Sequence, residues 1–159
     1  MRPQTLLMSC AVLALAACSN PVSSDATARW IAVFDHVPTA ADQQALTQAG
    51  AAHQIVYPIA HSVGFDGAGS GQKYFETPGV TVAFAISSVD ALRPAEFRTS
   101  APPTLADQQA ILAAGGTIDK IDPVKWSITG RLAFSKLSAL SNTPSITLVV
   151  VGCDCSRVL

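Results

Sequence analysis

The sequence predicts an α+β protein made of two related modules in tandem. The phrase PTAADQQALTQAG, which begins at Pro38, returns as PTLADQQAILAAG at Pro103, 65 residues later. Over 26 aligned positions from these two prolines, 11 residues are identical. A second pair of blocks, TPGVTVAFAI from Thr77 and TPSITLVVVG from Thr143, is spaced by 66 residues. Self-similarity at a nearly fixed period indicates a duplicated supersecondary unit.

The first module begins with RWIAVFDH, a nearly continuous apolar run that predicts a central strand. A helix is expected over Thr39–Gly50, because Thr39 and Asp42 have the spacing of a helix start and glycine is a natural helix stop. The segment HQIVYPIAHSVGF predicts two strands that are interrupted at Pro58. VTVAFAIS is apolar and rich in β-branched residues, and predicts another strand.

The second module repeats this pattern with a helix over Thr104–Gly115, two strands around Pro123 and a last strand in SITLVVVG. A second helix is expected before that last strand, where apolar residues have helical spacing (Phe134, Leu137 and Leu140). The first module has DGAGSGQKYFETP in the same place. We therefore expect a glycine-rich loop, and no second helix, between Asp66 and Glu76.

The order strand, helix, strand, strand, helix, strand is the ferredoxin-like arrangement, with helices on one face of an antiparallel sheet. We therefore expect two tandem ferredoxin-like (βαββαβ-type) modules, the first over residues 29–87 and the second over residues 103–159 with a C-terminal tail. The segment SVDALRPAEFRTSAPP predicts a linker over residues 88–102, so the second module would lack its first strand. Val80–Ser87 would close the first module, open the second, or be shared in one sheet.

The N-terminus has the features of a secretory signal. Arg2 precedes an apolar run, Thr5–Ala17, that is shorter than the roughly 20 residues of a membrane-spanning helix. Leu15-Ala16-Ala17-Cys18 resembles the lipobox of bacterial lipoproteins, in which the cysteine is acylated after cleavage. We expect a signal peptide over residues 1–17, a palmitate-type lipid anchor on Cys18 and a flexible tether over residues 18–28. The alternative is an ordinary signal peptide that is cut near Ala17.

These features predict a location in the bacterial cell envelope. In lipoproteins of two-membrane bacteria, an aspartate after the cysteine resembles an inner-membrane retention signal, and Ser19 therefore favours the outer membrane. The chain has a net charge of −1 and no basic run, which argues against nucleic-acid binding. Its content of 49% apolar and 13% charged residues is typical of a packed core.

A family resemblance follows from the order of short motifs. WIAVF, a helix that ends in glycine, a hairpin that ends in Gly64-Phe65, and PGV before the last strand resemble the propeptides and inhibitors of subtilisin-like serine proteases. In the second module, Gly130, the second helix and Pro144-Ser145-Ile146 follow the same order. The resemblance implies that a sheet face packs on the protease and that the chain leaving the last strand enters the substrate cleft as an added strand.

The equivalent tail in this sequence is Gly152–Leu159. The resemblance makes the end of the chain the candidate protease-contacting segment, with Val151, Gly152, Asp154, Ser156, Arg157, Val158 and Leu159 as its contact residues. Cys153 and Cys155 lie within it and form a candidate disulfide, which outside the cytoplasm would fix the tail. Intermolecular pairing of the two cysteines or a soft-metal site are the alternatives.

No catalytic constellation, cofactor motif or metal site is expected. His36, His53 and His61 all lie in the first module, but His53 and His61 align with Ile118 and Trp126, which favours partly buried strand positions over metal binding. DGAGSGQ lacks the pattern of a phosphate loop.

The sequence thus predicts a non-enzymatic, lipid-anchored binding protein whose best match is a protease inhibitor or chaperone. Its expected partner is another protein, with a subtilisin-like serine protease as the first candidate. One alternative is a structural or assembly lipoprotein that binds another envelope protein. A weaker alternative is an enzyme or metal binder centred on the histidines or on Cys153 and Cys155.

Overall fold

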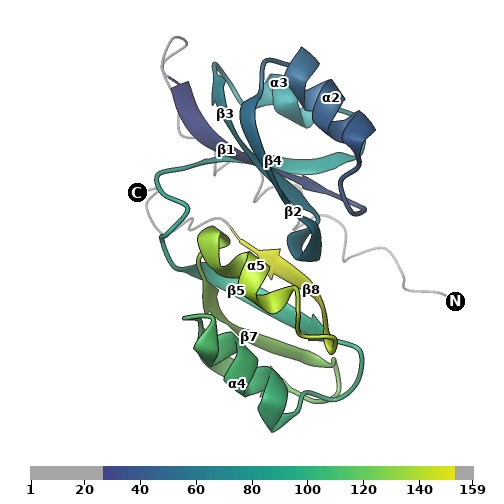
Figure 1. The fold of residues 1–159 in the computed structure, drawn as a ribbon, viewed down its shortest axis with the longest axis vertical. Coiled ribbons are helices and arrows are strands. Elements are labelled where there is room, and N and C mark those ends of the chain that lie inside the picture. Colours follow the sequence, from purple (N-terminus) through teal and green to yellow (C-terminus); the bar gives the residue numbers. More distant parts are fainter. Residues whose placement is uncertain (1–26, 153–159) are drawn as a thin grey trace, which may run out of the picture.

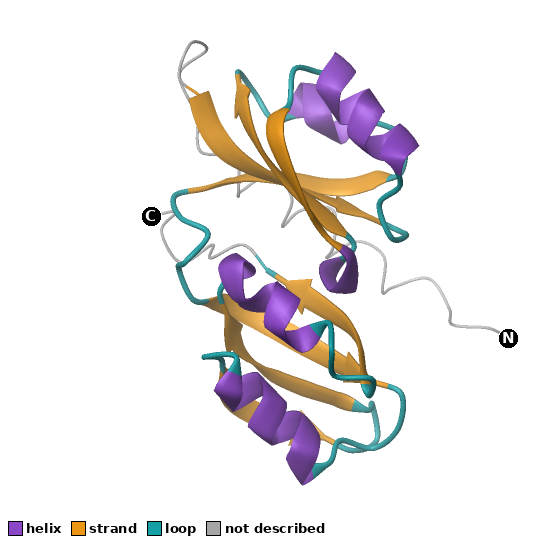
Figure 2. Cartoon of the chain, viewed as in Figure 1, coloured by secondary structure: helices purple, strands orange, loops and turns teal. Residues whose placement is uncertain are grey.

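A computed structural model describes residues 27–152 and contains two four-stranded antiparallel sheets (Figures 1 and 2). The α+β class and the twofold organisation predicted from the sequence are therefore present. The first sheet has the strand order β2-β3-β1-β4. Its strands are β1 (Thr27–Phe34), β2 (Ala52–Tyr57), β3 (Ser62–Ala68) and β4 (Val80–Ile86).

The second sheet has the equivalent order β6-β7-β5-β8. Its strands are β5 (Arg93–Thr99), β6 (Thr117–Asp122), β7 (Ser127–Leu132) and β8 (Ile146–Val151). The helical segments are α2 (Ala40–Gln48), η1 (Pro58–Ala60) and α3 (Gln72–Phe75) in the first module, and α4 (Leu105–Ala113), η2 (Phe134–Lys136) and α5 (Leu137–Leu140) in the second.

The repeated phrase forms the same structure twice. In α2 and α4, Thr39 and Thr104 are the N-caps, and each forms a capping box with the aspartate three residues later. Gly50 and Gly115 follow the two helices with φ angles of 94° and 82°, a left-handed conformation that glycine adopts without strain. Each helix buries one large side chain, Leu46 or Ile111, against its sheet.

The predicted linker over residues 88–102 is wrong, because it contains a central strand. Strand β5 pairs with both β7 and β8, and the second module therefore begins at Arg93 and has its own first strand. Its side chains alternate between buried (Ala95 and Phe97) and solvent-facing (Glu96 and Arg98). The charged and proline residues of RPAEFRT concealed this strand, since a sheet with one solvated face reads as alternating rather than continuously apolar.

The expected absence of a second helix in the first module is also wrong. Helix α3 (Gln72–Phe75) occupies the position that α5 has in the second module, and Tyr74 on α3 is fully buried. Its surroundings are glycine-rich because Gly67 and Gly71 allow close approach of Tyr74 and Trp30, respectively. Strand β4 pairs with β1 only, so Val80–Ile86 closes the first sheet and the two sheets do not share a strand.

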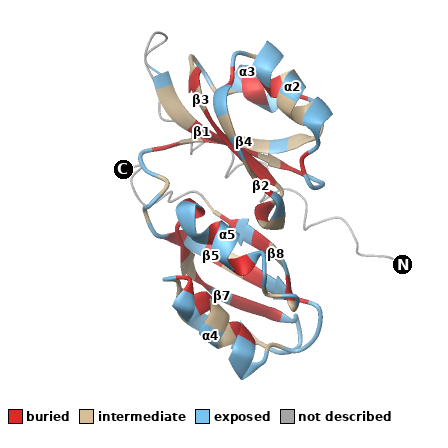
Figure 3. Ribbon diagram, viewed as in Figure 1, coloured by how far each residue is buried: buried red, intermediate tan, exposed pale blue. Residues whose placement is uncertain are grey.

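The first module packs against the second with one face of its sheet, while its other face has a core of its own (Figure 3). The helix-covered face of the first sheet holds Trp30, Phe65 and Tyr74 in a core of its own. The opposite face carries Ile31 and Phe84 into the core of the second module. The first sheet is therefore buried on both faces, which explains why β1 and β4 read as continuous apolar runs.

Phe134 lies at the centre of this contact. Its ring is 1% exposed and lies 5.7 Å from the ring of Tyr57 and 6.3 Å from that of Phe84, both in the first module. Segment η1 adds contacts to β8 and α5. The two modules thus share one continuous hydrophobic cluster.

Candidate partner-binding surface

The predicted tail begins at the edge of the second sheet. Val151 is paired with Ala95 on β5 and is only 7% exposed, so its inclusion among the contact residues is wrong: its side chain belongs to the core. Gly152 is the next residue, and its N–H donates to the carbonyl of Pro94 at 2.8 Å. The other predicted site residues lie outside the described residues: Cys18, Cys153, Asp154, Cys155, Ser156, Arg157, Val158 and Leu159.

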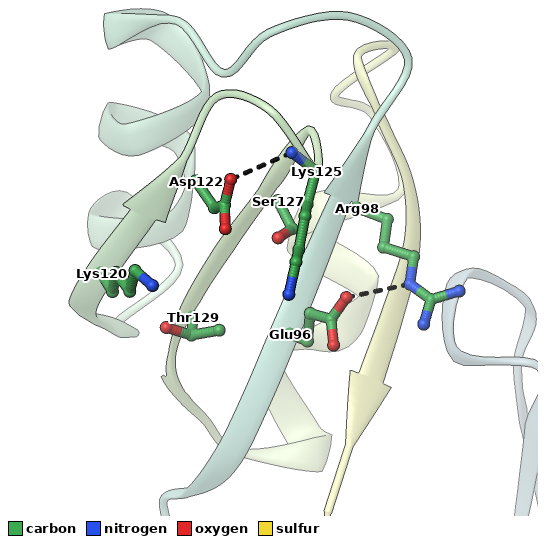
Figure 4. A pocket seen from close by; sticks show the side chains of 7 residues that line it. All are labelled: Glu96, Arg98, Lys120, Asp122, Lys125, Ser127 and Thr129. Atoms are coloured by element: carbon green, nitrogen blue, oxygen red, sulfur yellow. Dashed lines mark hydrogen bonds and ion pairs between the residues drawn. The ribbon is translucent and has the colours of Figure 1, made fainter. Parts of the chain in front are cut away.

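The second sheet has a polar face on the side opposite its helices. We call this the polar face; it consists of Glu96, Arg98, Lys120, Asp122, Lys125, Ser127 and Thr129 (Figure 4). These side chains line a shallow hollow of about 360 Å³. Cross-strand pairing brings them together, because Lys120 lies opposite Thr129 and Asp122 lies opposite Ser127.

The equivalent face of the first sheet has the opposite chemistry. At the repeat spacing of 65 residues, Glu96 corresponds to Ile31 and Arg98 corresponds to Val33. Ile31 is fully buried and packs with the core of the second module, together with the partly buried Val33. The duplication therefore produced one face that binds inside the molecule and one that faces solvent.

Charges on the polar face are only partly paired within it. Arg98 donates to Glu96 at 3.1 Å, in a side-chain ion pair on β5. The Asp122 carboxylate accepts hydrogen bonds from the backbone N–H groups of Lys125 and Val124 at 3.0 and 3.1 Å. These backbone bonds, the one from Lys125 foremost, hold the pKa of Asp122 below its ordinary value, with the charges of Lys120 and Lys125 contributing.

The hairpin that joins β6 to β7 presents apolar side chains beside the polar face. We call residues 123–126 the second tip. Val124 is 88% exposed and Trp126 is 46% exposed. Trp126 has a φ angle of 52°, a left-handed conformation that is rare for a bulky aromatic residue.

The matching hairpin of the first module, residues 58–61, forms the first tip. His61 corresponds to Trp126 and has nearly the same φ angle, 45°. Here the apolar residues are covered, since Ile59 packs on the shared core and Ala60 is 5% exposed. The first tip thus lies in the contact between modules, and the second does not.

The histidines are not partly buried strand residues, as the sequence had suggested. His53 belongs to β2 but occupies an irregularity in its pairing with β3, with its side chain 82% exposed. His61 lies in a turn, and His36 follows β1 with its side chain 44% exposed. Among residues 27–152, no three histidine, cysteine, aspartate or glutamate side chains are grouped so as to hold a metal ion.

Asp42 and Asp107 are the capping-box residues of α2 and α4, and each accepts a further hydrogen bond from a different kind of side chain. Asp107 is 1% exposed and accepts a short hydrogen bond from the Ser145 hydroxyl. Burial alone would raise the pKa of Asp107, but the bonds from Ser145 and Thr104 outweigh it, and the net pKa is lowered. In the first module, Gly79 stands at the position equivalent to Ser145 and has no hydroxyl to donate. The His36 ring lies against Gly79, and its Nε2 is 3.0 Å from Oδ2 of Asp42.

Acid is expected to weaken the first module through Asp42. Bonds from the Thr39 hydroxyl and N–H lower the pKa of Asp42 from 3.8 to about 2. Because the folded pKa lies below the unfolded one, this contribution is complete above about pH 4 and is lost as the pH falls through about 2. Urea midpoints measured between pH 5 and pH 2 should fall more steeply for the wild type than for Asp42→Ala. Equal slopes for the two proteins would contradict this.

His36 acts with the opposite sign. Hydrogen bonds with Asp35 and then Asp42 raise the pKa of His36 above 6.5. Its stabilisation is therefore present below about pH 6.5 and is lost as the pH rises through the folded pKa. Replacing His36 with Ala should abolish this loss and leave the acid response of Asp42 in place.

None of the helices among the described residues is long and apolar enough to cross a membrane. A comparison with models of known protein families finds no match for the chain, and a comparison with curated proteins finds none either.

Sequence reasoning missed the polar face because two of its seven residues, Glu96 and Arg98, lie on β5, within the predicted linker. The alternation of RPAEFRT was the signal that could have identified it. The exposure of Trp126 had no such signal, since its alignment with His61 had suggested a partly buried strand position.

Proposed function

We propose that the chain is an exported, lipid-anchored, non-enzymatic binding protein of the bacterial envelope, with two ferredoxin-like modules that resemble the propeptides of subtilisin-like proteases. It acts as an inhibitor or chaperone of a protease of that class. The element order and the strand orders β2-β3-β1-β4 and β6-β7-β5-β8 support the ferredoxin-like assignment. Cys18 holds the protein on the membrane, in the outer membrane of a two-membrane cell.

One observation carries the binding role: the two features that a propeptide-like inhibitor needs occur together in the second module. Its polar face presents the exposed side chains of Arg98, Lys120 and Lys125 and contributes no residue to the hydrophobic clusters of the described residues. Its edge strand β8 leads directly into the tail. The first module has neither feature, because Ile31 and Phe84 on its equivalent face are buried and β4 leads into the second module. The second module therefore contacts the partner, and the first module positions it.

Inhibition of a subtilisin-type protease tests this function. The protein recovered after expression of the whole chain should inhibit such a protease with an inhibition constant below about 1 µM, as expected for an interface of standard size. Deleting residues 153–159 should weaken inhibition at least about 10-fold, because an extended segment that adds a strand in the cleft supplies main-chain hydrogen bonds. Absence of inhibition, or inhibition unaffected by the deletion, would contradict the protease assignment.

A matched pair of variants locates the contact. Glu96→Lys combined with Arg98→Glu changes the polar face without changing net charge, and should weaken inhibition. Gln44→Ala changes an exposed position on α2 of the first module and should have no effect. Equal inhibition by both variants would place the contact elsewhere.

The exposed second tip also favours a second candidate, an assembly lipoprotein that binds another envelope protein. Val124 and Trp126 are exposed apolar residues that any protein with a complementary apolar surface could cover, whether or not it is a protease. A photo-crosslinker at position 124 should capture one envelope protein in cells that lack any inhibited protease. The anchor has its own test: Cys18→Ser should move the protein from the membrane fraction to the soluble fraction.

A further inference from the structure

The two hairpin tips allow an inference about the chemistry of the partner. The first tip is already a docking element, because η1 contacts β8 and α5 of the second module. Its apolar residues Ile59 and Ala60 are covered there. The second tip has the same place in its module. Trp126, like His61, has a left-handed backbone conformation just before the next strand. The second tip also exposes more apolar surface, on Val124 and Trp126.

The neighbours of the second tip carry more positive than negative charge among the described residues. The polar face has three cations (Arg98, Lys120 and Lys125) and two anions (Glu96 and Asp122), which gives +3 − 2 = +1 in a chain of net charge −1. Glu96 is paired with Arg98, and Asp122 accepts two backbone hydrogen bonds at the tip.

Lys120 and Lys125 are therefore the cations left for a partner. Neither forms an ion pair with a residue in the described part of the chain, although both lower the pKa of Asp122 through their charge. Figure 4 shows Lys125 extending from the second tip back along the sheet. At the repeat spacing these lysines correspond to Ile55 and Ala60, so both charges are specific to the second module.

We propose that the polar face and the second tip bind an acidic segment of a partner protein, with Lys120 and Lys125 pairing with its carboxylates and Trp126 and Val124 covering an adjacent apolar side chain. Hot spots of protein contacts are enriched in tryptophan, and the rim around them is polar. Complementary charges at the rim add specificity and speed association. The inference rests on the proposed function only in that the second module is the binding module. It does not require that the partner be a protease.

Selection from a phage-displayed library of random 12-residue peptides tests the proposal without assuming a partner. The protein recovered after expression of the whole chain is immobilised, and the retained peptides are sequenced. We expect an excess of Asp and Glu beside an apolar residue, and weaker binding at 0.5 M salt than at 0.05 M salt because screening shortens the range of the charges. Retained peptides without an acidic excess, or no retained peptides, would overturn the proposal.

Three variants then assign the contacts. Lys120→Glu with Lys125→Glu should raise the dissociation constant of a selected peptide at least about 10-fold, since like charges then face each other. Trp126→His should raise it about 30-fold, as for an aromatic hot spot, and keeps the residue that the first module has in the same backbone conformation. Lys73→Glu with Lys136→Glu makes the same change in net charge elsewhere and should leave binding unaltered.

The outcomes separate this inference from the protease assignment. Acidic peptides that depend on Lys120 and Lys125, without inhibition of any subtilisin-type protease, would support the inference and contradict the protease role. Inhibition together with peptides that are indifferent to the lysine reversals would overturn the inference alone. Binding lost equally in the Lys73 and Lys136 control would also overturn it, because only net charge would then matter.

Discussion

Phe134→Ala is expected to lower the free energy of unfolding by about 3–5 kcal/mol, the usual cost of removing a fully buried ring. The ring is 1% exposed and packs against Tyr57 and Phe84 of the first module. Its loss leaves a cavity at the point where the two cores join. We therefore expect the variant to unfold in two steps, whereas the wild type unfolds in one.

Each module contains one tryptophan that can report on this change. Trp30 is 2% exposed in the first core, and Trp126 lies on the second tip. Urea unfolding followed by fluorescence of single-tryptophan proteins (Trp126→His for one reporter, Trp30→Phe for the other) should give coincident midpoints with Phe134 and separate midpoints with Phe134→Ala. Phe75→Ala is the control, because that ring is 46% exposed and its removal should cost less than about 0.5 kcal/mol. A loss below about 1 kcal/mol for Phe134→Ala would contradict the assigned role.

The second large effect concerns a pair of contacting positions where the large and the small side chain have changed places between the two modules. In the first module, Trp30 packs over Gly71, where a Cβ atom would lie only 2.6 Å from the indole ring. The corresponding residues of the second module are Ala95 and Leu137, both in its core. Each module thus pairs one large side chain with one small residue.

Trp30→Ala should cost about 3–5 kcal/mol and Gly71→Leu about 1–3 kcal/mol, through a cavity and through overpacking respectively. The double variant reproduces the combination of the second module. We expect it to be more stable than the sum of the single changes predicts by about 2 kcal/mol, which is within the range of coupling for residues in contact. Urea unfolding of the four proteins in this cycle measures the coupling energy. Strict additivity would show that the two positions do not compensate for each other.

The backbone conformation of Gly71 allows any residue, so the coupling energy reports on side-chain packing alone. Its φ angle is −63°, so a larger residue is excluded by the indole ring and not by backbone strain. Gly115 is a useful contrast, because its φ angle is 82° and a Cβ atom there would meet no neighbour within 4 Å. Gly115→Ala is thus strained by backbone conformation alone.

The repeat and the apolar runs made α2, α4, α5 and seven of the eight strands among the described residues predictable. Thr39, Asp42 and Gly50 determine a helix by local hydrogen bonding and backbone freedom, and the same three residue types recur in the second module. Such signals act over a few residues, which is why both helices were predicted within one or two residues of their observed bounds. The elements that were missed, β5 and α3, have no strong local signal.

The candidate surface was less predictable than the fold. The tail was located by resemblance, but Val151 proved to be a core residue of the last strand. The polar face required the register of three strands, which places Lys120 opposite Thr129 and Glu96 opposite Thr129 across the sheet. Neighbours of this kind are distant in sequence, and alternation within one strand does not identify the partner strand.

By itself, the sequence determined that one unit with a capped helix and the strands after it occurs twice, and where the two capped helices begin and end. These features depend on residues close together in the chain. Only the tertiary structure decided that the first sheet is covered on both faces and the second on one. That difference follows from the burial of Ile31 and Val33 against the second module, while their counterparts Glu96 and Arg98 face solvent. Burial depends on what lies opposite a face, and a repeat in the sequence does not specify which copy receives a neighbour.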